Sequence, residues 1–429
     1  MNTATDTASG FEESTVGQCF HSDDFFRKAL AKKEEANQTT IQNKENKMKT
    51  YKTCESVRIG HPDKLCDFIA DFILDSCLEV DPESRVACEV MATGGKIIVA
   101  GEITCELRPY IESDVKKALQ ICGYSPDDFR VFVNCHRQSK DIANGVSNSL
   151  EERNGCEDRY SSLGAGDQGT VYGYATNETE EMLPLPLVLA HNICREIDIQ
   201  KREHRLRGVM PDGKAQVTVE YENGKAKRIK TVVVSVQHSW KKPIKELEDE
   251  ILNDVLPVAL SVFPDENTEI LINPSGCFNI GGPEADTGLT GRKIMVDTYG
   301  GLAAHGGGAF SGKDATKVDR SGAYMARYIA KNLVKAGLAD RCQVGISYAI
   351  GKAEPLAVSV ESFGTSNLSD EELAEIVTKV FDLRPAAIIE WFDLKKPIYK
   401  KTSAYGHFNA KEFPWEKTDR VTELVTSIG

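Results

Sequence analysis

The 429-residue sequence lacks the features that mark membrane, secreted and nucleic-acid-binding proteins. No run of about 18 apolar residues is present, so no transmembrane helix is predicted. The N-terminus has no apolar signal stretch, and eight acidic residues precede Met48, whereas transit peptides avoid acids. Basic residues are not in excess, because 52 Lys and Arg face 65 Asp and Glu, for a net charge of −13. We therefore expect a cytoplasmic protein that binds neither nucleic acid nor anionic membranes.

Paired cysteine motifs are also missing. The 12 cysteines are scattered, with no C-x-x-C pair and no spacing typical of a metal site. In a chain of this length they indicate reduced and mostly buried thiols. Because the chain is acidic overall, any phosphate binding requires a local concentration of basic residues.

Residues 1–47 differ in composition from the rest of the chain. They are rich in Asn, Thr, Lys and Glu, and they contain one short helical candidate, Asp23–Ala36. We expect a mobile N-terminal extension without chemistry of its own.

One pattern then occurs three times: a strand, a Gly-Lys turn, a β-branched strand and a helix. The turn glycines, Gly95, Gly224 and Gly351, lie 129 and 127 residues apart. A near-constant interval with the same element order predicts three related subdomains. The helices are expected around 111–121, 244–256 and 369–381.

The expected fold class is α/β of the α+β type, with mixed sheets covered by helices. A single doubly wound parallel sheet fits poorly, because each unit connects its strands by a hairpin.

The Gly60–Lys64 motif is the first candidate site. It stands before a predicted helix over Pro62–Glu79, whose free N–H groups suit a phosphate–magnesium complex held by His61, Asp63 and Lys64. An ordinary N-cap with solvated charges is the alternative, and for an isolated motif it is favoured. Further acids follow at helical spacing and predict a solvated stripe: Asp67, Asp71 and Asp75.

The predicted hairpin over Arg85–Thr104 carries two unusual acids. With Gly94 and Gly95 as turn residues, Glu89 lies opposite Ala100, so Glu89 and Glu102 share one face of the sheet. They could be solvent-facing, or they could hold a cation or an ammonium group.

Two glycine-rich regions follow. The Gly164–Gly169 loop presents Asp167 and could be a ligand loop or a plain connection. The second region, 273–321, includes a predicted strand over 294–299 and a P-loop-like Gly307-x4-Gly312-Lys313, which has Asp314 where Ser or Thr belongs. A phosphate site is favoured there by four cations: Arg292, Lys293, Lys313 and Lys317.

Five motifs, in the right order, closely resemble those of S-adenosylmethionine synthetases. The resemblance covers about Thr50–Lys417 and implies three intertwined subdomains related by pseudo-threefold symmetry. We expect boundaries at 48–147, 160–279 and 280–419. The motifs occupy residues 60–64, 164–169, 288–293, 305–314 and 317–321.

The resemblance implies synthesis of S-adenosylmethionine from ATP and L-methionine by a methionine adenosyltransferase. The methionine sulfur would attack C5′ of ATP, and the expelled triphosphate would be hydrolysed to pyrophosphate and phosphate. The catalytic residues would be His61, Lys214, Arg292 and Lys313. Methionine would contact Glu102, Gln138, Asp167, Asp286 and Lys317, and Gln138–Val146 would form a mobile gate. ATP would contact His61, Asp212, Lys214, Ser275, Phe278, Asp286, Arg292, Lys293, Ala309 and Lys313.

The resemblance also implies metals and partners. Asp63 and Asp319 would bind Mg²⁺, with two ions per site, and Glu89 would serve a K⁺ site. The protein would be a homodimer or a dimer of dimers with its sites at the subunit interface.

The chain departs from the family pattern at a few positions. Cys277 and Met210 stand where arginines are usual, Phe68 replaces a Gln, and Arg58-Ile59 replace Ser-Glu. Two alternatives remain open: a relative that binds nucleotide without turnover, and a P-loop NTPase.

Overall fold

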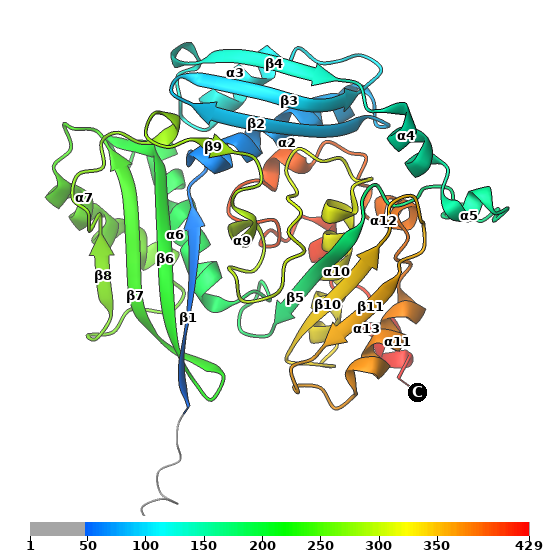
Figure 1. The fold of residues 1–429 in the computed structure, drawn as a ribbon. Coiled ribbons are helices and arrows are strands. Elements are labelled where there is room, and N and C mark those ends of the chain that lie inside the picture. The colour runs from blue at the N-terminus through cyan, green and yellow to red at the C-terminus, as the bar shows by residue number, and fades with distance from the viewer. Residues whose placement is uncertain (1–47, 429) are drawn as a thin grey trace, which may run out of the picture. The chain divides into compact units, whose positions relative to one another are not determined.

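Residues 48–428 are described by a computed structural model. The predicted mobile extension, with its helix over 23–36, lies outside the described residues. Within residues 50–428 the chain forms three sheets, each beside one long helix (Figure 1). The expected fold class is confirmed, because α-helices cover sheets that contain both parallel and antiparallel strand pairs.

The first sheet has the order β4-β3-β2-β9 and contains the predicted hairpin. The predicted register is confirmed, since Glu89 pairs with Ala100 and Thr93 with Lys96. Gly94 and Gly95 both have positive φ (45° and 72°), as a two-residue hairpin turn needs. The elements are β2 (Arg85–Thr93), β3 (Lys96–Thr104), β4 (Arg130–His136) and β9 (Gly288–Leu289), with helices α2 (Pro62–Val80) and α3 (Ile111–Ile121).

The second sheet has the order β1-β6-β7-β8, and helix α6 packs on β6. The predicted helix over 244–256 is present as two α-helices joined by a π-helical turn at 251–255. The elements are β1 (Lys49–Val57), α6 (Leu185–Arg202), β6 (Val209–Glu222), β7 (Lys225–His238), α7 (Ile244–Glu250), α8 (Leu256–Ala259) and β8 (Glu269–Ile272).

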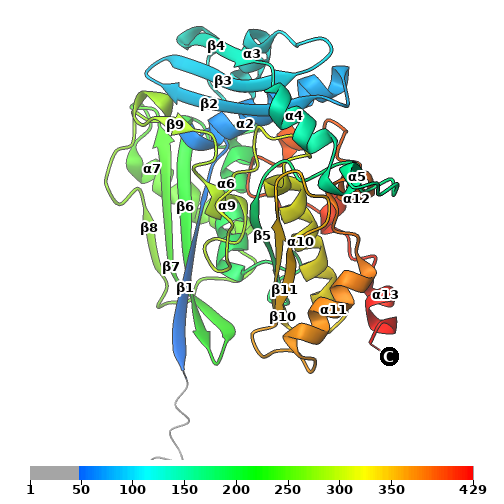
Figure 2. The ribbon, with the colours of Figure 1, turned by 45° about the vertical axis from the view of Figure 1, so that its right-hand side comes forward.

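The third sheet, β11-β10-β5, is antiparallel, and helices α10 and α11 lie along it (Figure 2). Ser369 caps α11 through a capping box with Glu372, at the predicted start. The elements are β5 (Gly169–Thr176), α10 (Val318–Lys335), β10 (Arg341–Tyr348), β11 (Ala357–Glu361) and α11 (Asp370–Val380).

The subdomains are intertwined, because each predicted range lends one strand to a sheet of another. β1 from the first range joins the second sheet, β5 from the second joins the third, and β9 from the third joins the first. Short helices make the remaining connections: α4 (Lys140–Ser147), α5 (Leu150–Arg153), α9 (Ile294–Asp297), α12 (Pro385–Phe392) and α13 (Val421–Thr426).

The strand predicted over 294–299 is wrong, because this segment begins with the single turn of helix α9. Asp297 of that turn bonds a buried lysine, and Thr298 donates to the carbonyl of Ile294 (2.8 Å). A β-branched run thus forms a turn because tertiary partners hold it there.

Candidate active site

The first turn of α2 assembles one group of candidate residues around Asp63. The backbone N–H of Leu289 donates to Oδ1 (3.0 Å), and Nζ of Lys293 lies 2.6 Å from Oδ2. Nε of Arg292 lies 3.7 Å from Oδ1. Burial alone would raise the pKa of the Asp63 carboxyl, but Lys293 and Leu289 hold it below its usual range. The carboxylate is therefore charged and faces two cations of one loop.

His61 is the N-cap of α2, but the solvated charges of the N-cap alternative are wrong, because His61, Asp63 and Lys64 are all buried. Its Nδ1 accepts a hydrogen bond from the backbone N–H of Asp63 (3.2 Å), so we assign the ring hydrogen to Nε2. Burial, with the Lys293 and Lys214 ammonium groups nearby, lowers the pKa of His61 to about 3. The imidazole is therefore neutral at pH 7 and offers one N–H donor.

The N-terminus of α10 repeats this arrangement around Asp319. Asp319 is the second residue of α10, as Asp63 is of α2, and Nζ of Lys313 lies 2.6 Å from its Oδ2. Gly308 packs against this carboxylate so closely that a Cβ would not fit. Helices α2 and α10 thus each begin with an aspartate that is paired to a lysine of a glycine-rich loop.

The solvated stripe predicted for α2 is wrong, because Asp67, Asp71 and Asp75 are all buried. Each carboxylate accepts backbone N–H groups of a distant loop. Asp67 accepts from Gly291 (2.8 Å), Asp71 from Gly312 (2.8 Å), and Asp75 from Tyr399 and Lys400 (2.8 and 3.0 Å). Asp67 and Asp71 therefore hold the two glycine-rich loops against α2, and Asp75 holds the short 3-10 helix Tyr399–Lys401.

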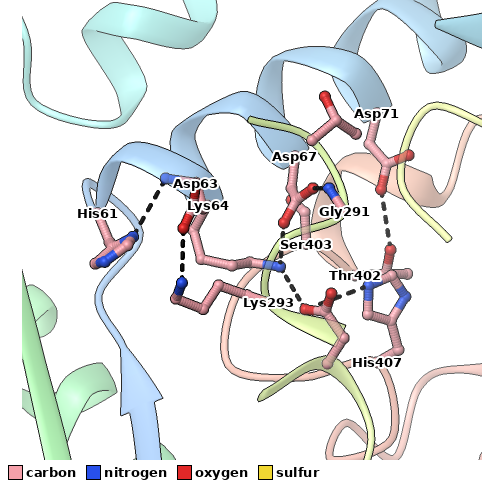
Figure 3. Close-up of polar contacts among 12 residues, drawn as sticks. His61, Asp63, Lys64, Asp67, Asp71, Gly291, Lys293, Thr402, Ser403 and His407 are labelled. Carbon is pink, nitrogen blue, oxygen red and sulfur yellow. Dashed lines mark hydrogen bonds and ion pairs between the residues drawn. The ribbon is translucent and has the colours of Figure 1, made fainter. Parts of the chain in front are cut away.

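Lys64 lies at the centre of a buried charge cluster (Figure 3). Its Nζ is 2.5 Å from Asp297 Oδ1 and 3.0 Å from Asp67 Oδ2. Burial raises the pKa of Asp67 to about 6 although Lys64 opposes the shift, and burial also raises the pKa of Asp297. Lys64 was a candidate for phosphate binding, but its ammonium is used inside the protein.

Both glycine-rich loops meet the edge of β2. The N–H of Cys88 donates to the Gly312 carbonyl (2.9 Å), and the N–H of Thr290 donates to the Val90 carbonyl (3.0 Å). Glu89 stands between these two attachments and is exposed. The hairpin therefore brings the Lys293 loop and the Lys313 loop to one strand.

The P-loop-like segment does not form a mononucleotide P-loop. A P-loop joins a strand to a helix, whereas Gly307–Lys313 follows an irregular segment after α9. Asp314 is buried, accepts the N–H of Val86 (2.6 Å) and pairs with Lys317 (2.5 Å). Its carboxylate supports the loop and offers no hydroxyl to a metal.

Comparisons with known proteins assign the chain to a family. The N-terminal, central and C-terminal domain models of S-adenosylmethionine synthetase match residues 49–144, 162–278 and 280–417. An S-adenosylmethionine synthase of Clostridium tetani is 49% identical over 391 residues, covering 89% of this chain and 100% of the relative. One of Desulforudis audaxviator is 49% identical over 385 residues, covering 87% and 97%.

The chain belongs to the S-adenosylmethionine synthetase family. It is therefore an enzyme of the transferase class, a methionine adenosyltransferase. No helix among residues 48–428 is long and apolar enough to cross a membrane.

The other residues that the synthetase resemblance assigns to ATP differ in burial and contacts, and the Lys214 ammonium lies near His61. The Asp212 carboxylate is buried and accepts the N–H of Gly282 (2.9 Å), whereas Lys214 is exposed. The N–H of Phe278 donates to His238 (3.3 Å). Ser275 is exposed, and a Cβ at Gly291 would lie 2.6 Å from that of Ala309, which places the two glycine-rich loops in contact.

The residues that the synthetase resemblance assigns to methionine are only partly gathered. Gln138 and Lys317 line one cavity of about 300 Å³. Among the described residues, no hydrogen bond or ion pair joins the side chains of Glu102, Asp167 or Asp286 to that cavity.

Arg58, which stands at one of the departures from the family pattern, is held inside this synthetase. Its guanidinium is buried, donates to the carbonyls of Met210 (2.6 Å) and Asp212 (3.0 Å), and pairs with Asp198 (2.7 Å). Its charge is therefore neutralised within the protein, and nothing in the structure explains Met210, whose side chain is exposed. Nothing in the structure explains Cys277, which is exposed.

The buried acids of α2 were the functional residues that sequence reasoning missed. The signal was present in their surroundings, because nearly every position between them is apolar, including Leu65, Ile69 and Leu74. A helix that is apolar on all sides has no solvent face, so its acids must be buried and paired.

Proposed function

We propose that this enzyme joins ATP and L-methionine by attack of the methionine sulfur on C5′ of ATP, and then hydrolyses the expelled triphosphate to pyrophosphate and phosphate. The observation that carries the proposal is the pair of aspartate–lysine contacts at the starts of α2 and α10, beside glycine-rich loops. A thioether sulfur needs no deprotonation, so the reaction needs no base. It needs charge stabilisation on the triphosphate and alignment of the two substrates.

His61 would stabilise the departing oxygen. A neutral imidazole with its hydrogen on Nε2 donates one hydrogen bond to the oxygen that leaves C5′, and it adds no charge that would attract water or a second anion. Lys214, Arg292, Lys293 and Lys313 would contact the phosphates, and Asp212, Ser275, Phe278, Asp286 and Ala309 would surround the nucleotide.

The described residues fit magnesium that arrives with ATP. Asp63 and Asp319 are hard oxygen donors, the type Mg²⁺ prefers, and Mg²⁺ is commonly held by one or two carboxylates together with substrate phosphates. Residues 48–428 contain no group of three or more His, Cys, Asp or Glu side chains that could hold a metal without substrate. Bound Mg²⁺ would neutralise triphosphate charge, and Lys293 and Lys313 would then turn from their aspartates to the phosphates.

The remaining assignments are those that the family resemblance implies. Glu89, exposed between the two loop attachments, would serve the K⁺ site. Glu102, Gln138, Asp167, Asp286 and Lys317 would contact methionine, with Asp286 reaching both substrates. Two copies would complete each site at their interface, as a homodimer or a dimer of dimers.

The proposal is tested by incubating the full chain with ATP, L-methionine, MgCl₂ and KCl and separating the products by chromatography. We expect S-adenosylmethionine, pyrophosphate and phosphate, with none formed when methionine or Mg²⁺ is omitted and less when K⁺ is omitted. Methionine-independent phosphate release would indicate an NTPase. ATP binding by calorimetry without product would indicate a binding protein and would overturn the proposal.

A further inference from the structure

One face of the β2–β3 hairpin presents charges of both signs in neighbouring rows. Arg85 pairs with Thr104 and Ala87 pairs with Glu102 in the antiparallel register. Directly paired residues point to the same face, and so do residues two apart on one strand. Arg85, Thr104 and Glu102 therefore share a face, and the backbone positions of Thr104 and Glu102 are about 7 Å apart along the strand.

Arg85 and Thr104 line the cavity of about 300 Å³ that also contains Gln138 and Lys317. This volume is at the small end of the range for ligand sites and suits an amino acid. The charged residues that line it are all cations, namely Arg85, Arg137 and Lys317. The cavity therefore favours the anionic end of a ligand.

The three cations differ in how readily each could bind an anionic ligand. Lys317 is bonded to the buried Asp314 carboxylate at 2.5 Å, so its charge is largely neutralised. Arg137 is exposed and screened by solvent. The Nη1 atom of Arg85 is buried and has no hydrogen-bond partner among the described residues.

A buried guanidinium nitrogen without a partner is costly, and a carboxylate is its best geometric match. Arg85 also lines a second, larger cavity of about 590 Å³, whose wall shares Ser147 and Thr316 with the first. The larger cavity is also lined by acids, among them Glu83, Glu390 and Asp393, whereas the smaller cavity has none, so the anion is expected in the smaller one.

We propose that Arg85 binds the carboxylate of the amino-acid substrate, while Glu102 on the same face takes its ammonium group. The opposite charges of the two side chains match the two charges of an amino-acid zwitterion. The inference rests on the proposed function, because it places methionine beside Gln138 and Lys317, and it adds a binding residue that the motifs do not contain.

Steady-state kinetics of Arg85→Met with L-methionine and with methioninol, which lacks the carboxylate, tests this assignment. We expect the KM for methionine to rise roughly 10- to 100-fold, as for a lost charge-assisted hydrogen bond, while the KM for ATP changes less than about twofold. The preference of the wild-type enzyme for methionine over methioninol should fall by the same factor. Arg130→Met, an exposed arginine at the start of β4, is the matched control and should leave all values unchanged.

Arg85→Lys keeps the charge without the planar fork and should give an intermediate KM, which preserves the test if Arg85→Met folds poorly. Unchanged discrimination against methioninol in both variants would overturn the role of Arg85. A wild-type enzyme that forms no S-adenosylmethionine would instead overturn the proposed function. In that case, calorimetry of methionine binding to wild type and Arg85→Lys still tests the carboxylate contact.

Discussion

Helices α2 and α10 begin alike and then use buried charge of opposite sign. Both carry an aspartate at the second position, and each aspartate lies 2.6 Å from a lysine of a glycine-rich loop. Farther along, α2 buries three carboxylates that accept loop N–H groups. α10 instead buries Arg320 and Arg327. The Arg320 guanidinium donates to a carbonyl of the Lys313 loop, and the Arg327 guanidinium donates to the carbonyl of Tyr174 on β5.

The difference follows from what each neighbouring loop leaves unpaired. Gly291 and Gly312 present N–H groups to α2, and buried N–H groups need acceptors. Tyr174 and Met182 present carbonyls to Arg327. Asp71 and Arg320 pair at 2.7 Å and connect the two helices. The sign of a buried charge therefore indicates the backbone group it satisfies. The α2 carboxylates accept N–H groups of the glycine-rich loops, and Arg320 of α10 donates to carbonyls of the Lys313 loop.

Breaking the ion pair between Asp71 and Arg320 should give the largest loss of stability. Asp71→Asn leaves the buried Arg320 without its counter-ion and should lower the free energy of unfolding by about 3–5 kcal/mol. Because Asp71 also holds Gly312, the KM for ATP should rise in the folded fraction. Urea unfolding and initial rates measure the two effects.

Arg327→Met is the matched variant on α10. It breaks the ion pair with Glu416, which lies away from the candidate site, so stability should fall while kcat and KM per folded enzyme stay unchanged. An equal rise in the KM for ATP in both variants would show that Arg327 supports the candidate site as much as Asp71 does.

The shared first turn predicts a second, slightly smaller effect. Asp63→Asn and Asp319→Asn should each lower kcat roughly 10²- to 10³-fold, because each removes a carboxylate that is proposed to hold Mg²⁺, whose charge would stabilise the leaving triphosphate. Asp370→Asn, another first-turn aspartate, is the control and should retain full activity. Loss of activity in only one of the two site variants would show that the pairs are not equivalent.

The corresponding long helix of the second sheet, α6, buries a neutral histidine and predicts a pH effect. Burial, with Arg195 and Lys64 nearby, lowers the pKa of His191 to about 3. The unfolded chain binds a proton near pH 6.5 and the folded chain does not, so stability is lost as pH falls below 6.5. Relative to wild type, His191→Gln should lose up to about 1.4 kcal/mol less per pH unit between pH 6 and 5, measured by urea unfolding. A parallel pH dependence in the two proteins would contradict this.

The smallest effect is expected for an exposed acid that pairs with a lysine four residues later on the same helix. Glu112 on α3 pairs with Lys116 at 2.8 Å, and both side chains are exposed. Glu112→Ala should leave the melting temperature and the activity close to those of the wild type, because solvent screens an exposed ion pair. Thermal melts and initial rates measure this, and a large drop in melting temperature would show that exposure does not separate α3 from α2.

Local features of the fold were predictable from the sequence. The Gly94-Gly95 turn and strand alternation predicted the register that pairs Glu89 with Ala100. The helix expected from residue 369 begins there, with Ser369 as its N-cap. These features depend on neighbours within a few residues, and their signals lie in the same few residues.

Features that depend on distant partners were not predictable in the same way. The segment from Ile294 has the composition of a strand, yet it forms a helical turn because Asp297 pairs with Lys64, 233 residues away. The acids of α2 have the spacing of a solvated stripe, yet segments around residues 291, 312 and 400 cover them.

The sequence by itself therefore determined the three hairpin–helix units, the family and the residue types of the candidate site. Only the tertiary structure decided which charges are buried and which strand joins which sheet. It also decided which cation of the small cavity has a buried nitrogen without a hydrogen-bond partner among the described residues. A side chain's spacing is local, but its burial and its partners depend on chain that is hundreds of residues away, and the cost of burying an unpaired charge makes those distant partners decisive.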